Sequence, residues 1–262
     1  MRAEGWVVEG AGQGLEAALE GYAARGYARI GLALSREGIA ALHARAEDLM
    51  LGRVSYPGLF FQHETASGRY EDLPYGEGYQ GPSLDYRKLE KLEKDPLFFA
   101  WIQNPLFERI ARALIPGEVA IYRAALFNKP VWGGSPLPWH QDGGSFWGLD
   151  RDPTLQIWTA LDDAPEGGGC LEVVEGSHKA GLATPLGGVI PAEVVAAADA
   201  ERRVTSLPVR AGEVILVHNH LWHRSGVNRS GHPRRALTVC YMSRATRCLR
   251  KRRAPRVFTP VF

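Results

Sequence analysis

The sequence predicts an α+β protein whose core is a β-barrel-like jelly roll, with helices of the N-terminal part packed on it. Two observations carry this prediction: helical patterns dominate residues 1–118, and short strand-like runs follow one another across residues 119–262. Helices first and many short strands afterwards are typical of this architecture. No linker or internal repeat divides the 262 residues, and a barrel of that size can form one core. We therefore expect a single domain.

Composition places the chain in a broad class. It is 45% hydrophobic and 23% charged, and its net charge of +2 does not indicate a polyanion-binding protein. The three cysteines, Cys170, Cys240 and Cys248, are too few and too scattered for a disulfide framework. We see no apolar run long enough for a signal peptide or a membrane span. These features predict a cytoplasmic protein with no membrane partner.

The N-terminal part begins with two predicted helices and a strand between them. Residues 13–25 carry apolar side chains at helical spacing, and Gly26 is a suitable C-terminal stop. Residues 27–32 fit a short strand. Ser35 is a favourable N-cap for a second helix over about 36–51.

The segment 52–84 is the least regular part of the chain, because it is rich in glycine and tyrosine and interrupted by prolines. A connection of this length is either a lid over a binding site or a surface loop packed by its own aromatic side chains. Helix is expected again near 86–94 and over 96–114, where Pro105 separates two short helices.

For the second half of the chain the sequence predicts strands with one insert. A short helix over 191–200 is expected inside an insert near 180–203. The strand-like runs, rich in β-branched and aromatic residues, are 119–127, 155–161, 171–174, 206–209, 214–217 and 235–242.

The pair His140 and Asp142 is the main candidate for chemistry. On an extended backbone, side chains two residues apart lie on the same face, so an imidazole and a carboxylate could reach one metal ion. His223, which lies 81 residues after Asp142, is the best candidate for a third ligand. Taken singly, each of these residues is more often structural. Together they form the two-histidine, one-carboxylate set of non-haem Fe(II) oxygenases, which leaves one face of the ion open.

The surrounding motifs make the pattern more specific. In order along the chain they are His140-x-Asp142, Trp158-Thr159-Ala160-Leu161, Gly169-Cys170-Leu171, Gly176-Ser177-His178 and His223-x-Ser225-Gly226-x-Asn228, followed by Arg234. Their order and spacing resemble the phytanoyl-CoA dioxygenase family across roughly the second half of the chain. The resemblance implies a double-stranded β-helix fold, with Fe(II) as the metal and 2-oxoglutarate and O₂ as co-substrates.

The same resemblance implies which residues hold 2-oxoglutarate. Arg234 matches the arginine that pairs with the distal carboxylate, a contact suited to the planar guanidinium fork. Its neighbour Arg235 would point to the opposite face of a strand. Ser225 matches a hydroxyl that hydrogen-bonds the same carboxylate. Lys129 matches a lysine that also reaches the co-substrate, although a lysine before a proline could equally be a solvated strand end.

Aromatic residues near the metal motif are candidates for the walls of a substrate pocket. Trp158 and Thr159 point to opposite faces of one strand, and the sequence does not say which face is interior. Trp139, Phe146 and Trp147 flank the metal motif; they could line the pocket, although core packing is the more usual role of such side chains.

Other residues offer second choices. His218 and His220 could be mistaken for ligands, whereas His178 fits a structural role in a turn. The segment 244–256 holds seven basic residues. Such a run could attract nucleic acid or a phosphorylated substrate, or it could be a solvated tail or an oligomer contact.

The resemblance implies hydroxylation of an unactivated carbon of a small molecule, with release of succinate and CO₂. Relatives that halogenate lack the carboxylate, so the presence of Asp142 favours hydroxylation. The family spans acyl-CoA esters, amino-acid derivatives and secondary metabolites, and the sequence does not choose among them. Two alternatives stay open: the same chemistry on nucleic acid, and a barrel that binds a metal or small molecule without turnover.

Overall fold

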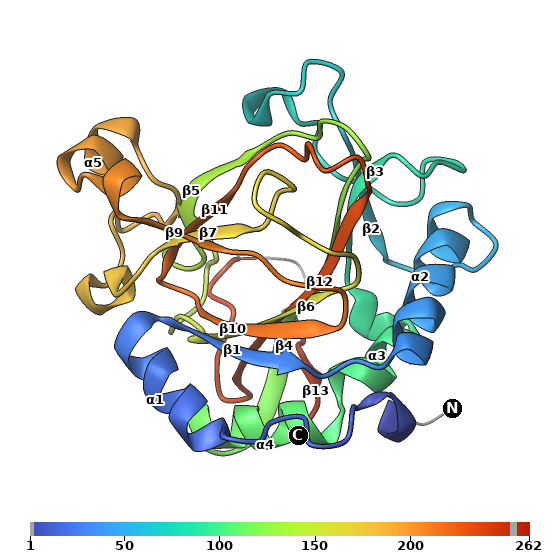
Figure 1. Cartoon of the computed structure of the whole chain (residues 1–262), viewed down its shortest axis with the longest axis horizontal. Helices are drawn as coiled ribbons and strands as arrows, with labels where there is room; N and C mark the ends of the chain where they lie inside the picture. The colour runs from blue at the N-terminus through green and yellow to red at the C-terminus, as the bar shows by residue number, and fades with distance from the viewer. Residues whose placement is uncertain (1–2, 252–255) are drawn as a thin grey trace.

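The chain folds into two antiparallel sheets that face each other, as the computed structural model in Figure 1 shows for residues 3–251 and 256–262. Within these residues the larger sheet has eight strands and the smaller has five. The larger runs in the order β1 (Tyr27–Leu32), β10 (Glu213–His218), β6 (Leu155–Ala160), β12 (Arg234–Ser243), β4 (Val119–Lys129), β3 (Tyr86–Glu90) and β2 (Phe60–His63), with β13 (Thr259–Pro260) paired to β4. The smaller runs in the order β8 (Gly188–Val189), β5 (Leu137–Gln141), β11 (Trp222–Ser225), β7 (Leu171–Val174) and β9 (Val204–Leu207).

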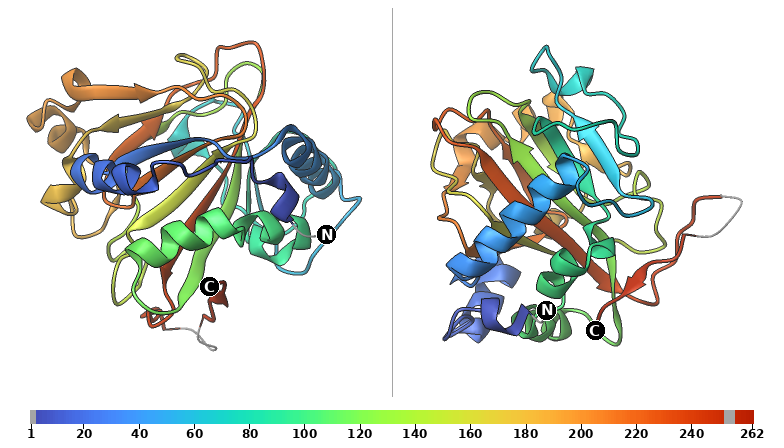
Figure 2. Two further views of the ribbon diagram at one scale, coloured as in Figure 1. Left: turned by 60° about the horizontal axis from the view of Figure 1, so that its bottom comes forward. Right: turned by 90° about the vertical axis from the view of Figure 1, so that its right-hand side faces the viewer.

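Helices from the first half of the chain cover the outer face of the larger sheet (Figure 2). None of the helices in the described part of the chain is long and apolar enough to span a membrane. The α-helices are α1 (Leu15–Arg25), α2 (Arg36–Met50), α3 (Pro96–Ile102), α4 (Pro105–Leu114) and α5 (Ala192–Ala197). The 3-10 helices are η1 (Ala3–Trp6), η2 (Tyr70–Asp72), η3 (Leu92–Lys94), η4 (Ser177–Ala180) and η5 (Ala200–Arg203).

Alternation along the central strands divides the interior into two layers. Leu155 and Ile157 of β6 belong to the main core, which the larger sheet forms with α1–α4. Trp158 and Ala160 of the same strand pack instead with Val173 and other residues of the smaller sheet. The region between the two sheets is therefore the barrel interior, and the jelly-roll prediction is confirmed.

Local signals at the helix ends are confirmed. The side chain of Ser35 accepts a hydrogen bond from the backbone N–H of Gly38 at the start of α2. Asn104 caps α4 in the same way, with Pro105 at its first position, so that two short helices replace one long one. The predicted helix in the insert is α5, slightly shorter than expected.

One element was predicted wrongly, and β2 is among the strands that were not expected. Residues 86–94, expected as helix, form β3 followed by η3, because β3 is hydrogen-bonded between β4 and β2. Lys91, with φ at 66°, ends the strand. Within 52–84, β2 pairs with β3 and extends the larger sheet, so this segment is only partly irregular. A lid role for the rest of it stays a prediction.

Gly26 ends α1 in a left-handed conformation with φ at 86°, and its N–H donates to the carbonyl of Tyr22. A Cβ placed there would lie 2.6 Å from Nδ1 of His178 and 2.7 Å from Cδ1 of Leu221. Gly26→Ala is therefore expected to lower the free energy of unfolding by about 3 kcal/mol, from left-handed strain and steric overlap together. Gly14→Ala is the control, because Gly14 has a φ of 70° but open space around it. Gly14→Ala should lower the free energy of unfolding by about 1 kcal/mol, from left-handed backbone strain alone. Equal losses for the two variants in denaturant titrations would contradict this account.

Candidate metal centre

His140 and His223 face each other across two neighbouring strands. His140 lies on β5 and His223 on β11, and the two residues are direct cross-strand partners. Side chains in such a pair project from the same face of the sheet, within contact distance. Their ring centroids are 3.9 Å apart, and both residues are buried. Hydrogen bonding between the strands therefore brings together two imidazoles that lie 83 residues apart in the sequence.

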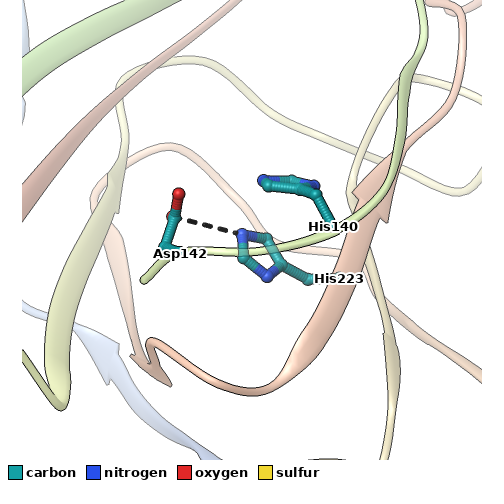
Figure 3. A group of neighbouring side chains, drawn as sticks. All are labelled: His140, Asp142 and His223. Carbon is teal, nitrogen blue, oxygen red and sulfur yellow. Dashed lines mark ion pairs between the residues drawn. The ribbon is translucent and has the colours of Figure 1, made fainter. Parts of the chain in front are cut away.

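Asp142 completes the group just beyond the end of β5 (Figure 3). Its N–H donates to the carbonyl of Asn219, which fixes the backbone where the strand ends. Its Oδ2 lies 3.6 Å from Nε2 of His223 and accepts a hydrogen bond of 2.7 Å from Nε2 of Gln156. One ligand atom from each of His140, Asp142 and His223 lies within 4.8 Å of the others.

The protonation states suit a metal. Nδ1 of His140 lies 2.9 Å from the Pro138 carbonyl, and Nδ1 of His223 lies 2.8 Å from the Leu221 carbonyl. Each contact favours the tautomer with a proton on Nδ1 and leaves Nε2 as the ligand atom. Burial and then His223 lower the pKa of His140 to about 3. Burial alone would raise the pKa of Asp142, but Arg123 and the histidines outweigh it and hold that pKa below its usual range.

These donors fit a divalent transition metal. Two neutral imidazole nitrogens and an ionised carboxylate, oriented by carbonyl groups and by an amide, form the donor set of a facial triad. Among the described residues, this is the one group of three or more such side chains close enough to share an ion.

At the other end of the same pocket, two cations lie side by side. Arg234 of β12 and Lys129 of β4 are cross-strand partners, and both are buried. Nε of Arg234 has no partner among the described residues, and Nζ of Lys129 donates to the Ser135 carbonyl at 2.9 Å. Burial, followed by Arg234 and Arg87, lowers the pKa of Lys129 well below its usual value. Burial also lowers the pKa of Arg234 to about 10. Paired cations of this kind fit a carboxylate that lies between them.

The remaining predicted residues divide into two groups. Ser225 and Trp158 line the pocket together with the triad, Arg234 and Lys129. On β6 the inward face thus carries Trp158, and Thr159 points outward, where it accepts a hydrogen bond from Trp101. Arg235 also points outward as expected and pairs with Asp162 at 3.0 Å.

Two aromatic residues expected at the pocket lie elsewhere. Trp139 neighbours His140 on β5, so it points to the opposite face and packs with Ile190 and Trp222 outside the barrel. Phe146 is 60% exposed and does not line the pocket. Its neighbour Trp147 is buried but stacks on Tyr122. The prediction of pocket contacts by Trp139 and Phe146 was therefore wrong.

Among the pocket residues that were not singled out from the sequence, three bear on its chemistry: Gln156, Arg123 and Arg87. Gln156 could have been found, because it lies two residues before Trp158 and so shares its face of β6. Arg123 shares a face of β4 with Lys129 by the same rule, six residues apart. Arg87 had no such signal, because its strand was predicted as helix.

The other histidines and the basic segment lie outside the triad. His220 pairs with Asp152 at 2.9 Å, and the rings of His178 and His218 are 4.9 Å apart. In the basic segment, Arg244 pairs with Glu118 at 3.0 Å and Arg247 pairs with Asp150 at 3.1 Å. Arg252 and Arg253 lie outside the described residues. Because Arg244 and Arg247 are paired with acidic side chains, they give little support to a nucleic-acid-binding surface in this segment.

Comparison with known proteins agrees with this geometry. The sequence model of the phytanoyl-CoA dioxygenase family matches residues 22–236. Over 159 residues the chain is 30% identical to phytanoyl-CoA dioxygenase domain-containing protein 1 of Mus musculus, covering 58% of this chain and 54% of that protein. Over 163 residues it is 27% identical to L-proline trans-4-hydroxylase of Streptomyces griseoviridis, covering 53% of this chain and 60% of that one. The chain spans about half the length of the curated relatives it matches.

The fold is shared with solved structures. The epimerase SnoN, crystallised with Fe3+, alpha ketoglutarate and nogalamycin RO, matches with a TM-score of 0.68 at 20% identity. The match covers 95% of this chain and 96% of that one. The likeness therefore extends over the whole jelly roll and its helices.

Proposed function

We propose, because the chain belongs to the phytanoyl-CoA dioxygenase family, that residues 1–262 act as one domain that hydroxylates an unactivated carbon of a small molecule. Members of that family are non-haem iron enzymes that use 2-oxoglutarate. The balanced reaction takes the substrate C–H bond, O₂ and 2-oxoglutarate to the C–OH product, succinate and CO₂. The cluster of His140, Asp142 and His223 is the observation that carries the proposal.

The triad holds the metal in this proposal. Nε2 of each histidine and a carboxylate oxygen of Asp142 are its ligands, while the Pro138 and Leu221 carbonyls and Gln156 keep the ligands oriented. Fe(II) held by these residues would supply the redox chemistry that couples O₂ and 2-oxoglutarate to oxidation of the substrate C–H bond.

Arg234, Lys129 and Ser225 hold the co-substrate. The two cations bind the distal carboxylate of 2-oxoglutarate, and the Ser225 hydroxyl donates to the same group. All three residues are buried, so they exclude water and form these contacts in a site of low dielectric constant. Trp158 adds an apolar side chain to the lining of the same pocket.

The relatives support a small molecule as substrate. One is named for phytanoyl-CoA and another for hydroxylation of L-proline, and SnoN was crystallised with nogalamycin RO. These names span different sizes and chemistries, so the class of substrate has to come from the residues of this pocket.

Anaerobic titration of the Fe(II)-loaded protein with 2-oxoglutarate tests the proposal. We expect a weak visible charge-transfer band that saturates with the co-substrate, because a 2-oxo acid chelates the metal through its carboxylate and keto oxygens. Glutarate is the matched control; it has both carboxylates but lacks the keto group, so it should give no band. Protein with metal confirmed bound but no band would instead be a metal-binding barrel without oxygenase activity.

A further inference from the structure

Arg123 of β4 lines the pocket at its metal end, and its side-chain Nε has no hydrogen-bond partner among the described residues. Its Nη2 lies 3.6 Å from Oδ1 of Asp142, and its Nη1 lies 3.8 Å from Oε1 of Glu90. Both separations are ion-pair distances beyond the range of a hydrogen bond. A guanidinium carries five N–H donors, so most of its capacity is unused.

Both carboxylates near Arg123 are committed to other partners. Glu90 lies closer to Lys88, at 2.9 Å from its Nζ. Asp142 already accepts from Gln156, and its charge is shared with the metal once the ion is bound. Arg123 therefore forms only long ion pairs with these two carboxylates, while its side chain is only 22% exposed to solvent.

The pocket lining is richer in basic than in acidic side chains. Its basic residues are Arg87, Arg123, Lys129 and Arg234, whereas Asp142 is its one carboxylate among the described residues. Glu64 lies 3.9 Å from Arg87 and Glu90 lies 3.8 Å from Arg123, so both carboxylates stand beyond hydrogen-bond range of these guanidinium groups.

The Arg123 guanidinium is also held in place. Its Cζ lies 5.3 Å from the ring centre of Trp147, which stacks on Tyr122 at 4.2 Å. Contact with an aromatic face restrains a guanidinium without using its N–H donors. Those donors thus stay available for a ligand.

We propose that Arg123 binds an anionic group, a carboxylate or a phosphate, of the prime substrate beside the metal, so that the enzyme selects anionic small molecules. The inference rests on the proposed oxygenase function and adds the substrate class. Because Arg123 lies 3.6 Å from Asp142, an anion bound to its guanidinium would lie next to the metal site.

The test uses matched acids and amides as probes. Protein loaded with Fe(II) and saturated with 2-oxoglutarate under anaerobic conditions is titrated with butyrate against butyramide, with L-proline against L-prolinamide, and with inorganic phosphate. Perturbation of the charge-transfer band reports binding. We expect at least one acid or phosphate to bind at least about tenfold more tightly than the neutral or amide probes, the usual gain from a charge-assisted hydrogen bond.

Two variants assign that preference to Arg123. Arg123→Gln should reduce it by about tenfold in protein confirmed to hold Fe(II) and 2-oxoglutarate. Arg123→Lys keeps the charge and should restore part of the preference. Weaker 2-oxoglutarate binding in Arg123→Gln would assign Arg123 to the co-substrate, and weaker metal binding would make it a positioning residue for Asp142.

Other outcomes would also overturn the proposal. They are a preference for acids that survives in Arg123→Gln, equal binding of acids and amides, and no response to any probe. The wild-type band with 2-oxoglutarate alone reports the proposed function separately. If that band forms and the acid preference does not, only the substrate class is wrong.

Discussion

Asp142→Asn is expected to weaken metal binding by more than about 100-fold and to abolish hydroxylation. Residues that merely orient metal ligands are worth about 10- to 100-fold in metal affinity, so the loss of a ligand charge should exceed that range. The variant keeps the side-chain volume, and its backbone N–H still donates to Asn219. Calorimetric titration of the apo protein with Fe(II) under anaerobic conditions measures the affinity directly.

A second aspartate provides the control for this variant. Asp152 lies 2.9 Å from Nε2 of His220, so Asp152→Asn also removes a carboxylate from a histidine. Because Asp152 lies outside the triad, the metal affinity of this variant should stay within about threefold of wild type. Thermal melts of both proteins check folding. Equal metal affinities for the two variants would show that Asp142 is not a ligand.

Side-chain alternation explains why the centre of the site could be predicted from the sequence. His140 and Asp142 lie two apart, and Arg234 and Arg235 lie on opposite faces of β12, one toward the pocket and one toward Asp162. The period of a strand determines these orientations without knowledge of its neighbours. The same rule, applied fully, would have rejected Trp139 as a pocket residue, because it is adjacent to His140.

Tertiary contacts explain what could not be predicted. Residues 86–94 alternate lysine, leucine and glutamate, which are good helix formers, yet β3 exists because β4 and β2 provide hydrogen-bonding partners on both sides. Arg123 presents a similar case. An arginine on a strand normally indicates a solvated face, and only the pairing of β4 with β12 and the closure of the second sheet place it 3.6 Å from Asp142.

The second large effect is expected at the cationic end of the pocket, where Arg234 and Lys129 lie. Arg234→Met is expected to weaken 2-oxoglutarate binding by about 100-fold or more, because truncating one partner of a buried charge pair costs about 2–5 kcal/mol. The apo protein should nevertheless lose little stability. Arg234 is a buried cation beside Lys129, its Nε has no partner among the described residues, and methionine preserves most of its apolar volume.

Arg235→Met should show the reverse behaviour. Arg235 points away from the pocket and pairs with Asp162 at 3.0 Å and with Glu47 at 3.2 Å. Loss of Arg235 removes a positive charge from beside the Asp162 carboxylate. The free energy of unfolding should therefore fall by about 1–3 kcal/mol, while the affinity for 2-oxoglutarate is unchanged. Denaturant titration and the anaerobic band measure the two quantities independently. Opposite responses from adjacent arginines would show that Arg234 serves the co-substrate, whereas parallel responses would show that the residue acts through the fold alone.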